Sequence, residues 1–116
     1  MPAKEESSAR IRALNDQMRT AGPGAPSRNR WLLTSGVLGL GATAVEAVVA
    51  RVTAFSEFTE DNDPHGEHDF GSIEMGGERL FWKIDYYDHT LTGGSPDPAD
   101  EAVTCRVLTI MLAMEY

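Results

Sequence analysis

Two glycines, Gly76 and Gly77, join two segments in which apolar and polar residues alternate. A Gly-Gly connection fits the two-residue turns that link antiparallel strands. Alternation with a period of two indicates a strand that buries one face. We therefore predict a β-hairpin from residues 70–75 and 79–87. The face of its second strand assigned to the core holds Leu80, Trp82, Ile84 and Tyr86.

The turn fixes which residues pair across this hairpin. Ile73 would face Leu80, and Glu74 would face Arg79. An apolar pair and an opposite-charge pair both favour this register. The other face of the second strand is unusually aromatic for a surface in water; it holds Phe81, Lys83, Asp85 and Tyr87.

Three helices are predicted around this hairpin. A polar start (1–6), expected to fray, precedes a helix to about Thr20 whose narrow apolar seam suggests a peripheral position. A Gly/Pro-rich linker (22–30) and a short strand (31–34) follow. Thr43 and Glu46 have the spacing of a capping box, which predicts a second helix from Thr43 to about Glu57.

The last helix is predicted from Asp97 to about Glu115. Asp97, Pro98 and the acids that follow resemble a capped helix start. The fold class is therefore α+β, a small single domain (1–116) in the order α-β-α-β-β-α. It would contain a mainly antiparallel three-stranded sheet packed by helices.

The cysteine content indicates a compartment. Cys105 is the chain's single cysteine, so it has no internal disulfide partner. Together with the lack of a secretory signal at the N-terminus, this favours a cytoplasmic location. No apolar run approaches the roughly 18–20 residues that span a bilayer, so no membrane association is expected.

Charge is unevenly distributed along the chain. Residues 1–58 hold seven basic and five acidic side chains, whereas residues 59–116 hold three basic and thirteen acidic ones. An acidic half repels phosphate backbones, so direct nucleic-acid binding is not expected of it. It would attract cations or a basic protein surface.

The segment FTEDNDPHGEHDFG, residues 58–71, concentrates groups that could bind a metal. The candidate ligands for a divalent metal are Asp63, His65, His68 and Asp69. Aligned as a calcium-binding EF-hand loop from Asp61, the segment fails at its last ligand position, which Ser72 occupies. No zinc-type spacing accompanies the histidines, so no cofactor is expected by default.

The same segment also has the composition of a turn. Asn62, Asp63 and Pro64 favour turn initiation, and Gly66 suits a positive φ. A rigid acidic loop beside an aromatic strand would form a surface for a basic partner. The candidate contact residues are Asp61, Asp63, Glu67, Asp69, Asp85, Tyr87 and Asp88.

Four segments together carry a resemblance to a known family: FTEDNDPHGEHDFG, FWKIDYYD, GSPDPAD and TCRVLTIMLAMEY. From about Ile11 to the C-terminus the chain resembles a bacterial family of short acidic proteins known only as a domain of unknown function. The resemblance implies a cytoplasmic bacterial protein, common on chromosomes and mobile elements. It implies no activity, cofactor or catalytic residue.

Three functions are consistent with these features. The leading hypothesis is a non-enzymatic acidic protein that binds a basic, nucleic-acid-binding protein, as an inhibitor or counter-defence factor of a mobile element. The second is a metal-dependent enzyme of the phosphodiester-hydrolysis class, or a metal-binding module, centred on the 58–71 segment. The third is a structural subunit or homodimer that uses the N-terminal helix or the aromatic strand face.

Overall fold

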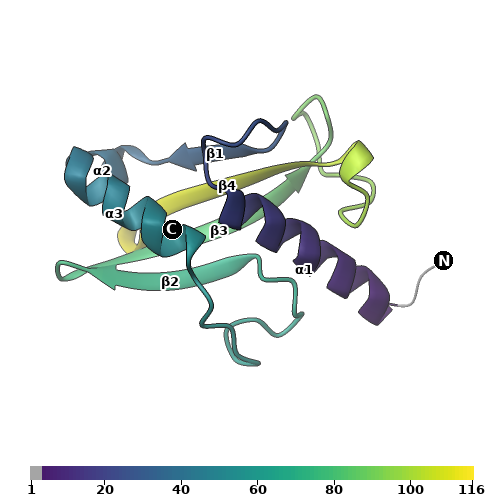
Figure 1. The fold of residues 1–116 in the computed structure, drawn as a ribbon, viewed down its shortest axis with the longest axis horizontal. Coiled ribbons are helices and arrows are strands. Elements are labelled where there is room, and N and C mark those ends of the chain that lie inside the picture. The colour runs from purple at the N-terminus through teal and green to yellow at the C-terminus, as the bar shows by residue number, and fades with distance from the viewer. Residues whose placement is uncertain (1–3) are drawn as a thin grey trace.

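The computed structural model describes residues 4–116, and Figure 1 shows its fold. Residues 1–3, half of the segment expected to fray, lie outside the described part. The helices are α1 (Lys4–Ala21), α2 (Ser35–Leu38) and α3 (Ala42–Thr53). The strands are β1 (Arg30–Leu33), β2 (Phe70–Met75), β3 (Glu78–Tyr87) and β4 (Cys105–Leu112), and short 3₁₀ turns span Glu101–Val103 and Ala113–Glu115. The predicted α+β class is confirmed.

The sheet has four strands rather than the three expected, in the order β1-β4-β3-β2. β4 pairs in parallel with β1 and antiparallel with β3, so the sheet is mixed. The predicted helix from Asp97 to Glu115 is wrong, because that segment supplies the central strand β4. Its nearly continuous apolar run is typical of a strand buried on both faces, which periodicity alone does not distinguish from a buried helix.

The hairpin of β2 and β3 has the predicted register. Ile73 pairs with Leu80, and Glu74 pairs with Arg79, whose guanidinium lies 2.8 Å from the glutamate oxygen. Leu80, Trp82 and Ile84 are buried as expected. Gly71, opposite Trp82, leaves space for the indole, since a Cβ at this position would overlap it.

The central helices differ in detail from the prediction. α3 begins at Ala42 with Gly41 as its N-cap, and no side chain caps it, so the predicted capping box does not form. α3 ends at Thr53, four residues before the expected end. The short helix α2 was not predicted; Thr34 caps its start by accepting a hydrogen bond from the Val37 amide.

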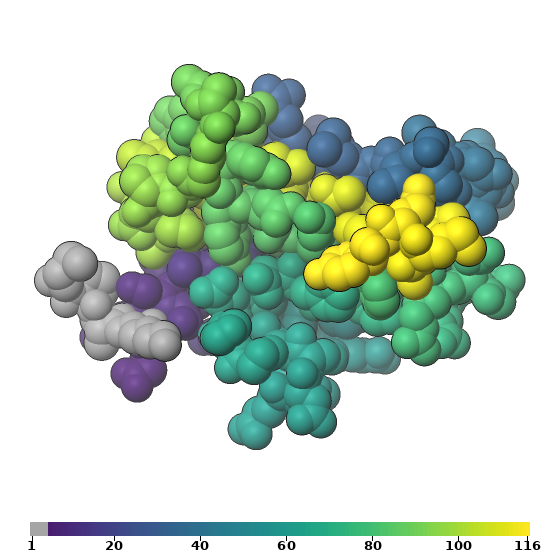
Figure 2. All heavy atoms as spheres, turned by 180° about the vertical axis from the view of Figure 1, so that it is seen from behind, coloured from purple at the N-terminus to yellow at the C-terminus, as the bar shows by residue number. Residues whose placement is uncertain are grey.

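One face of the sheet is covered by helices. α1 and α3 lie across this face in Figure 1, with the main core between them and the sheet. On the opposite side, Figure 2 shows the β3–β4 loop and the C-terminal residues. Tyr116 packs there edge-on against Phe70 and Phe81, with ring centroids 6.1 and 5.6 Å away.

α1 is held to the domain by polar as well as apolar contacts. Ile11, Leu14 and Met18 are buried, and so are Asn15 and Arg19 on the same side of the helix. Arg19 donates to the carbonyl oxygens of Val52, Thr53 and Phe55 at the C-terminal end of α3. A cation at this end complements the helix dipole, so α1 fixes the end of α3 and the start of the next loop.

Within residues 4–116, no helix is both long and apolar enough to cross a membrane.

Candidate functional site

The acidic segment forms the loop between α3 and β2, and it has two differently organised parts. We call residues 57–61 the acidic tip and residues 63–69 the stem. Asn62, between them, accepts a hydrogen bond from the Thr59 amide and donates to the Glu57 carbonyl, each at 2.8 Å. Gly66 has a φ of 67°. Both residues have the turn roles predicted from the sequence.

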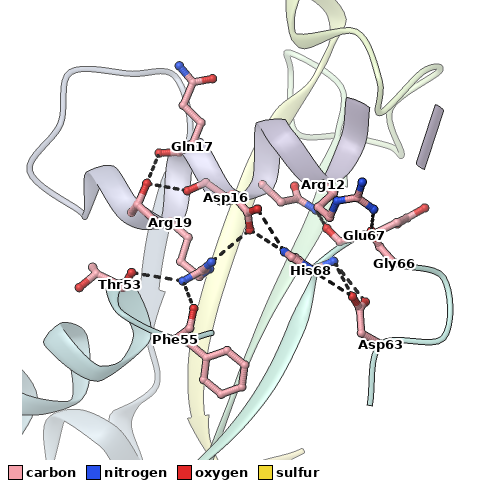
Figure 3. Close-up of polar contacts among 12 residues, drawn as sticks. Arg12, Asp16, Gln17, Arg19, Thr53, Phe55, Asp63, Gly66, Glu67 and His68 are labelled. Atoms are coloured by element: carbon pink, nitrogen blue, oxygen red, sulfur yellow. Dashed lines mark hydrogen bonds and ion pairs between the residues drawn. The ribbon is translucent and has the colours of Figure 1, made fainter. Parts of the chain in front are cut away.

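α1 holds the stem through side chains on one side of the helix, as Figure 3 shows. Arg12 donates to the Gly66 carbonyl and Asn15 donates to the Glu67 carbonyl, each at 2.9 Å. Asp16 Oδ1 lies 2.9 Å from Nδ1 of His68. Residues three and four apart share a helix face, so the sequence of α1 presents these groups together.

His68 is the most constrained residue of the stem. Its φ of 55° lies in the left-handed region, which is uncommon for residues other than glycine. Its ring stacks on Phe58 with a centroid separation of 3.7 Å, and its backbone amide donates to Asp63 Oδ1 at 3.2 Å. Nε2 lies 3.6 Å from Asp63 Oδ2. His68 is therefore held between carboxylates from α1 and from its own loop.

The four candidate metal ligands do not converge. His68 and Asp63 are neighbours, but His65 is exposed and Asp69 is half-buried. Over residues 4–116, no group of three or more His, Cys, Asp or Glu side chains is placed to hold a metal ion.

A buried polar network continues from the stem into the core. The Tyr86 hydroxyl donates to Glu67 Oε1 at 3.0 Å and accepts from Asn15 at 2.9 Å. Asn15 Oδ1 in turn accepts from Arg106 Nε at 2.6 Å. Burial raises the pKa of Tyr86, so its hydroxyl stays protonated and available as a donor. The stem therefore reaches β3 through the Glu67 side chain and also through the Asp69 carbonyl, which accepts from the Ile84 amide at 2.8 Å.

The loop carboxylates therefore have different environments. Asp63 and Glu67 make contacts inside the protein, and Asp69 is half-buried. Burial, and then the charge of Glu67, raise the pKa of Asp69. In the acidic tip, no hydrogen bond or ion pair among the described residues engages the exposed carboxylates of Glu57, Glu60 and Asp61.

The remaining candidate contacts lie at the end of β3. Asp85 pairs with Lys83 at 2.9 Å, and Tyr87 is half-buried on the same strand face. Asp88 accepts hydrogen bonds from the Thr92 amide and the Thr90 hydroxyl, which hold its pKa below the usual value. Their register places Asp85 and Tyr87 on the face away from α1 and α3.

Sequence reasoning missed the residues that organise this site from a distance. Asn15, Asp16 and Arg106 are separated from their partners by more than fifty positions. The available signal was the spacing of Arg12, Asn15, Asp16 and Arg19 on one helix face. It indicates that polar residues share a face, but it does not identify their partners.

Comparison with known proteins gives a family and no function. Neither the curated proteins nor the solved structures contain a match to the chain. The model of one family, described as Protein of unknown function (DUF3768), matches residues 33–115. That range includes the loop, the hairpin and β4, but not α1, and it starts later than the resemblance from Ile11 suggested. Because the match covers well over half of the sequence, the chain belongs to the DUF3768 family.

Proposed function

We propose that the chain is a non-enzymatic binding protein whose acidic tip engages a basic surface of a protein partner. The observation that carries this proposal is the contrast in the loop between a stem held by α1 and a tip of unpaired carboxylates. In Figure 2 the chain around the loop, coloured teal, projects at the lower edge of the molecule.

A held loop favours binding in two ways. Groups that are already ordered lose less conformational entropy on association than a flexible acidic segment would lose. Fixed carboxylates also present a defined pattern of charge, which steers a basic partner and selects its orientation. Asn62 contributes directly, because its two bonds to Thr59 and Glu57 shape the tip.

The seven candidate contacts differ in their exposure and in their bonds. Asp61 is exposed at the tip, whereas Asp85, Tyr87 and Asp88 are half-buried at the end of β3. Asp63 bonds within the loop, Glu67 accepts from Tyr86 of β3, and Asp69 is half-buried. We assign direct contact to Asp61 with its neighbours Glu57 and Glu60, and a secondary contribution to the end of β3.

A basic partner of this kind is a nucleic-acid-binding protein, because spaced carboxylates can replace phosphates in a basic groove. An inhibitor acting against a nucleic-acid-targeting complex in a bacterial cytoplasm fits the small size and the acidity. A reducing compartment also suits Cys105, whose buried thiol lies 3.1 Å from the Arg28 carbonyl oxygen.

The test is capture of partners from cells that naturally produce the chain. The bait would be wild type, the variant Glu57→Lys/Glu60→Lys/Asp61→Lys, and the control Glu5→Lys/Glu6→Lys at the exposed start of α1. We expect a basic protein to be retained by wild type and by the control but lost from the tip variant, with retention weakening as salt rises. Equal retention by all three baits would contradict the proposal.

Self-association is a second candidate, and one observation favours it. Phe70, Phe81 and Tyr116 form an aromatic cluster on the sheet face that carries no helix, and Tyr116 is 75% exposed. Light scattering across a concentration series would detect a dimer. Loss of that dimer in Tyr116→Ser would assign the face, and a monomer at all concentrations would dismiss it.

A further inference from the structure

A cavity of about 200 Å³ opens between the second half of α1, the turn after it and the β1–β4 end of the sheet. It is smaller than the cavities that hold drug-sized ligands, so it suits a molecule of about a dozen heavy atoms at most. Leu14, Met18 and Trp31 provide apolar walls, and Gln17, Asn29 and Glu101 provide polar ones.

Arg106 contributes a buried cation to this cavity. Its side chain belongs to the lining although the residue is only 2% exposed. Nε donates to Asn15, Nη2 donates to the Pro98 carbonyl, and the guanidinium lies over the Tyr86 ring at 5.3 Å. Within residues 4–116, Nη1 makes no hydrogen bond and no carboxylate lies at ion-pair distance from Arg106.

Arg19, another buried arginine of the same protein, has a counter-ion, although its Nε makes no hydrogen bond. It donates to three carbonyl oxygens and pairs with Asp16 at 3.1 Å. Removing a charge from water is costly unless hydrogen bonds and an opposite charge compensate. Burial lowers the pKa of Arg106, yet arginine remains charged in proteins. Within the described residues, the charges of Glu101 and Glu67 act on this cation only from beyond ion-pair distance.

We propose that this cavity binds a small carboxylate with an apolar side group. The carboxylate would accept hydrogen bonds from the guanidinium of Arg106. Such charge-assisted hydrogen bonds are roughly twice as strong as those between neutral groups. The side group would lie against Leu14, Met18 and Trp31. The site is independent of the acidic tip, so it goes beyond the proposed function.

Two kinds of molecule carry this chemistry. A simple aryl or alkyl carboxylate would use Arg106 and the apolar walls alone. A free amino acid would also present an ammonium group, for which the exposed carboxylate of Glu101 is available at the lining. The two are distinguished by the response to Glu101→Gln, which affects only the second.

The test uses the two tryptophans of the chain as internal probes. Trp31 lines the cavity, whereas Trp82 is fully buried in the core. Phenylalanine, 3-phenylpropionate and phenethylamine would be titrated into ¹⁵N-labelled full-length protein while the two indole N–H signals are followed. We expect a saturable shift of the Trp31 signal, and not of Trp82, with one or both carboxylates and none with the amine.

Variants connect the shift to the cavity. Gln17→Phe fills its mouth from an exposed position and should abolish binding, whereas Ala13→Phe on the outer side of α1 should not. Arg106→Lys should weaken binding by roughly tenfold, since it removes charge-assisted hydrogen bonds. The proposal is overturned if neither carboxylate shifts the Trp31 signal at millimolar concentration, if the amine shifts it equally, or if Gln17→Phe leaves the titration unchanged.

Discussion

The acidic tip and the stem are adjacent and similarly acidic, yet their carboxylates do opposite things. In the stem, Asp63 holds the His68 amide and Glu67 accepts from Tyr86. In the tip, the carboxylates of Glu57, Glu60 and Asp61 are exposed and make no hydrogen bond or ion pair within the described residues. Acidic residues that are close together in the sequence therefore fall into two groups. The carboxylates of one group hold the loop together, and those of the other group are exposed and unpaired.

α1 creates this division. Within the loop, Arg12, Asn15 and Asp16 bond only the stem, so their bonds order residues 66–68 and leave the tip carboxylates in water. If the division is real, changes in the stem should alter stability, and changes in the tip should alter binding alone.

The largest effect on stability is expected at Asn15. Asn15→Ala removes the donor to Glu67 and Tyr86 and leaves the buried Nε of Arg106 without its acceptor. Since buried polar groups without partners are costly, the free energy of unfolding should fall by about 3 kcal/mol. Urea unfolding measures it, with exposed Gln17→Ala as the control. A loss no larger than the control's would show that the stem is not held from α1.

His68→Ala should have the next largest effect. It removes the contact with Asp16 and the stacking on Phe58, and it places alanine at a φ of 55°. We expect a loss of about 2 kcal/mol in the free energy of unfolding. His68→Asn should cost less, because asparagine tolerates left-handed backbone better. If the two variants lose the same free energy of unfolding in chemical denaturation, the left-handed backbone at residue 68 does not contribute to the loss.

Asp69 should produce a smaller effect that depends on pH. Its pKa in the folded protein is raised above the ordinary 3.8, mainly by burial, so the folded state holds this proton more tightly than the unfolded state. Stability is therefore lost as pH rises through the folded pKa. Asp69→Asn should be more stable than wild type at pH 7, with the advantage shrinking as pH falls toward 3.8. A pH-independent difference in melting temperature would contradict this assignment.

The smallest effect on stability belongs to the tip. The triple variant Glu57→Lys/Glu60→Lys/Asp61→Lys changes exposed side chains without partners, so unfolding should shift by no more than about 0.5 kcal/mol. Thermal unfolding beside the partner-capture experiment measures both properties of one protein. A large destabilisation would mean that tip carboxylates also build the fold.

The predictable parts of this protein were the local ones. Gly76 and Gly77 specify a turn between alternating strands, so the hairpin and its register followed from neighbouring residues. β4 was mistaken for a helix because a strand between two others buries both faces, which removes the alternation. Val107, Thr109 and Ile110, which are β-branched, were the signal that favoured a strand.

The turn of the loop could be predicted from the sequence, but the contacts that hold the loop from α1 could not. Asn62 and Gly66 are recognisable because their conformations are set locally. The contact of Asp16 with His68 spans 52 positions, and the contact of Asn15 with Arg106 spans 91. Such contacts depend on how α1 packs across the sheet, which no short window of sequence contains.

Amide hydrogen exchange, followed residue by residue, tests the division between tip and stem most directly. The amides of Asp63, Gly66 and His68 donate within the loop at 2.8, 3.0 and 3.2 Å, and the loop is held by α1. We predict slow exchange at these three positions, fast exchange at Glu60 and Asp61, and loss of the slow exchange in Asn15→Ala. Uniformly fast exchange across residues 57–69 in the wild-type protein would contradict a loop held in place from α1.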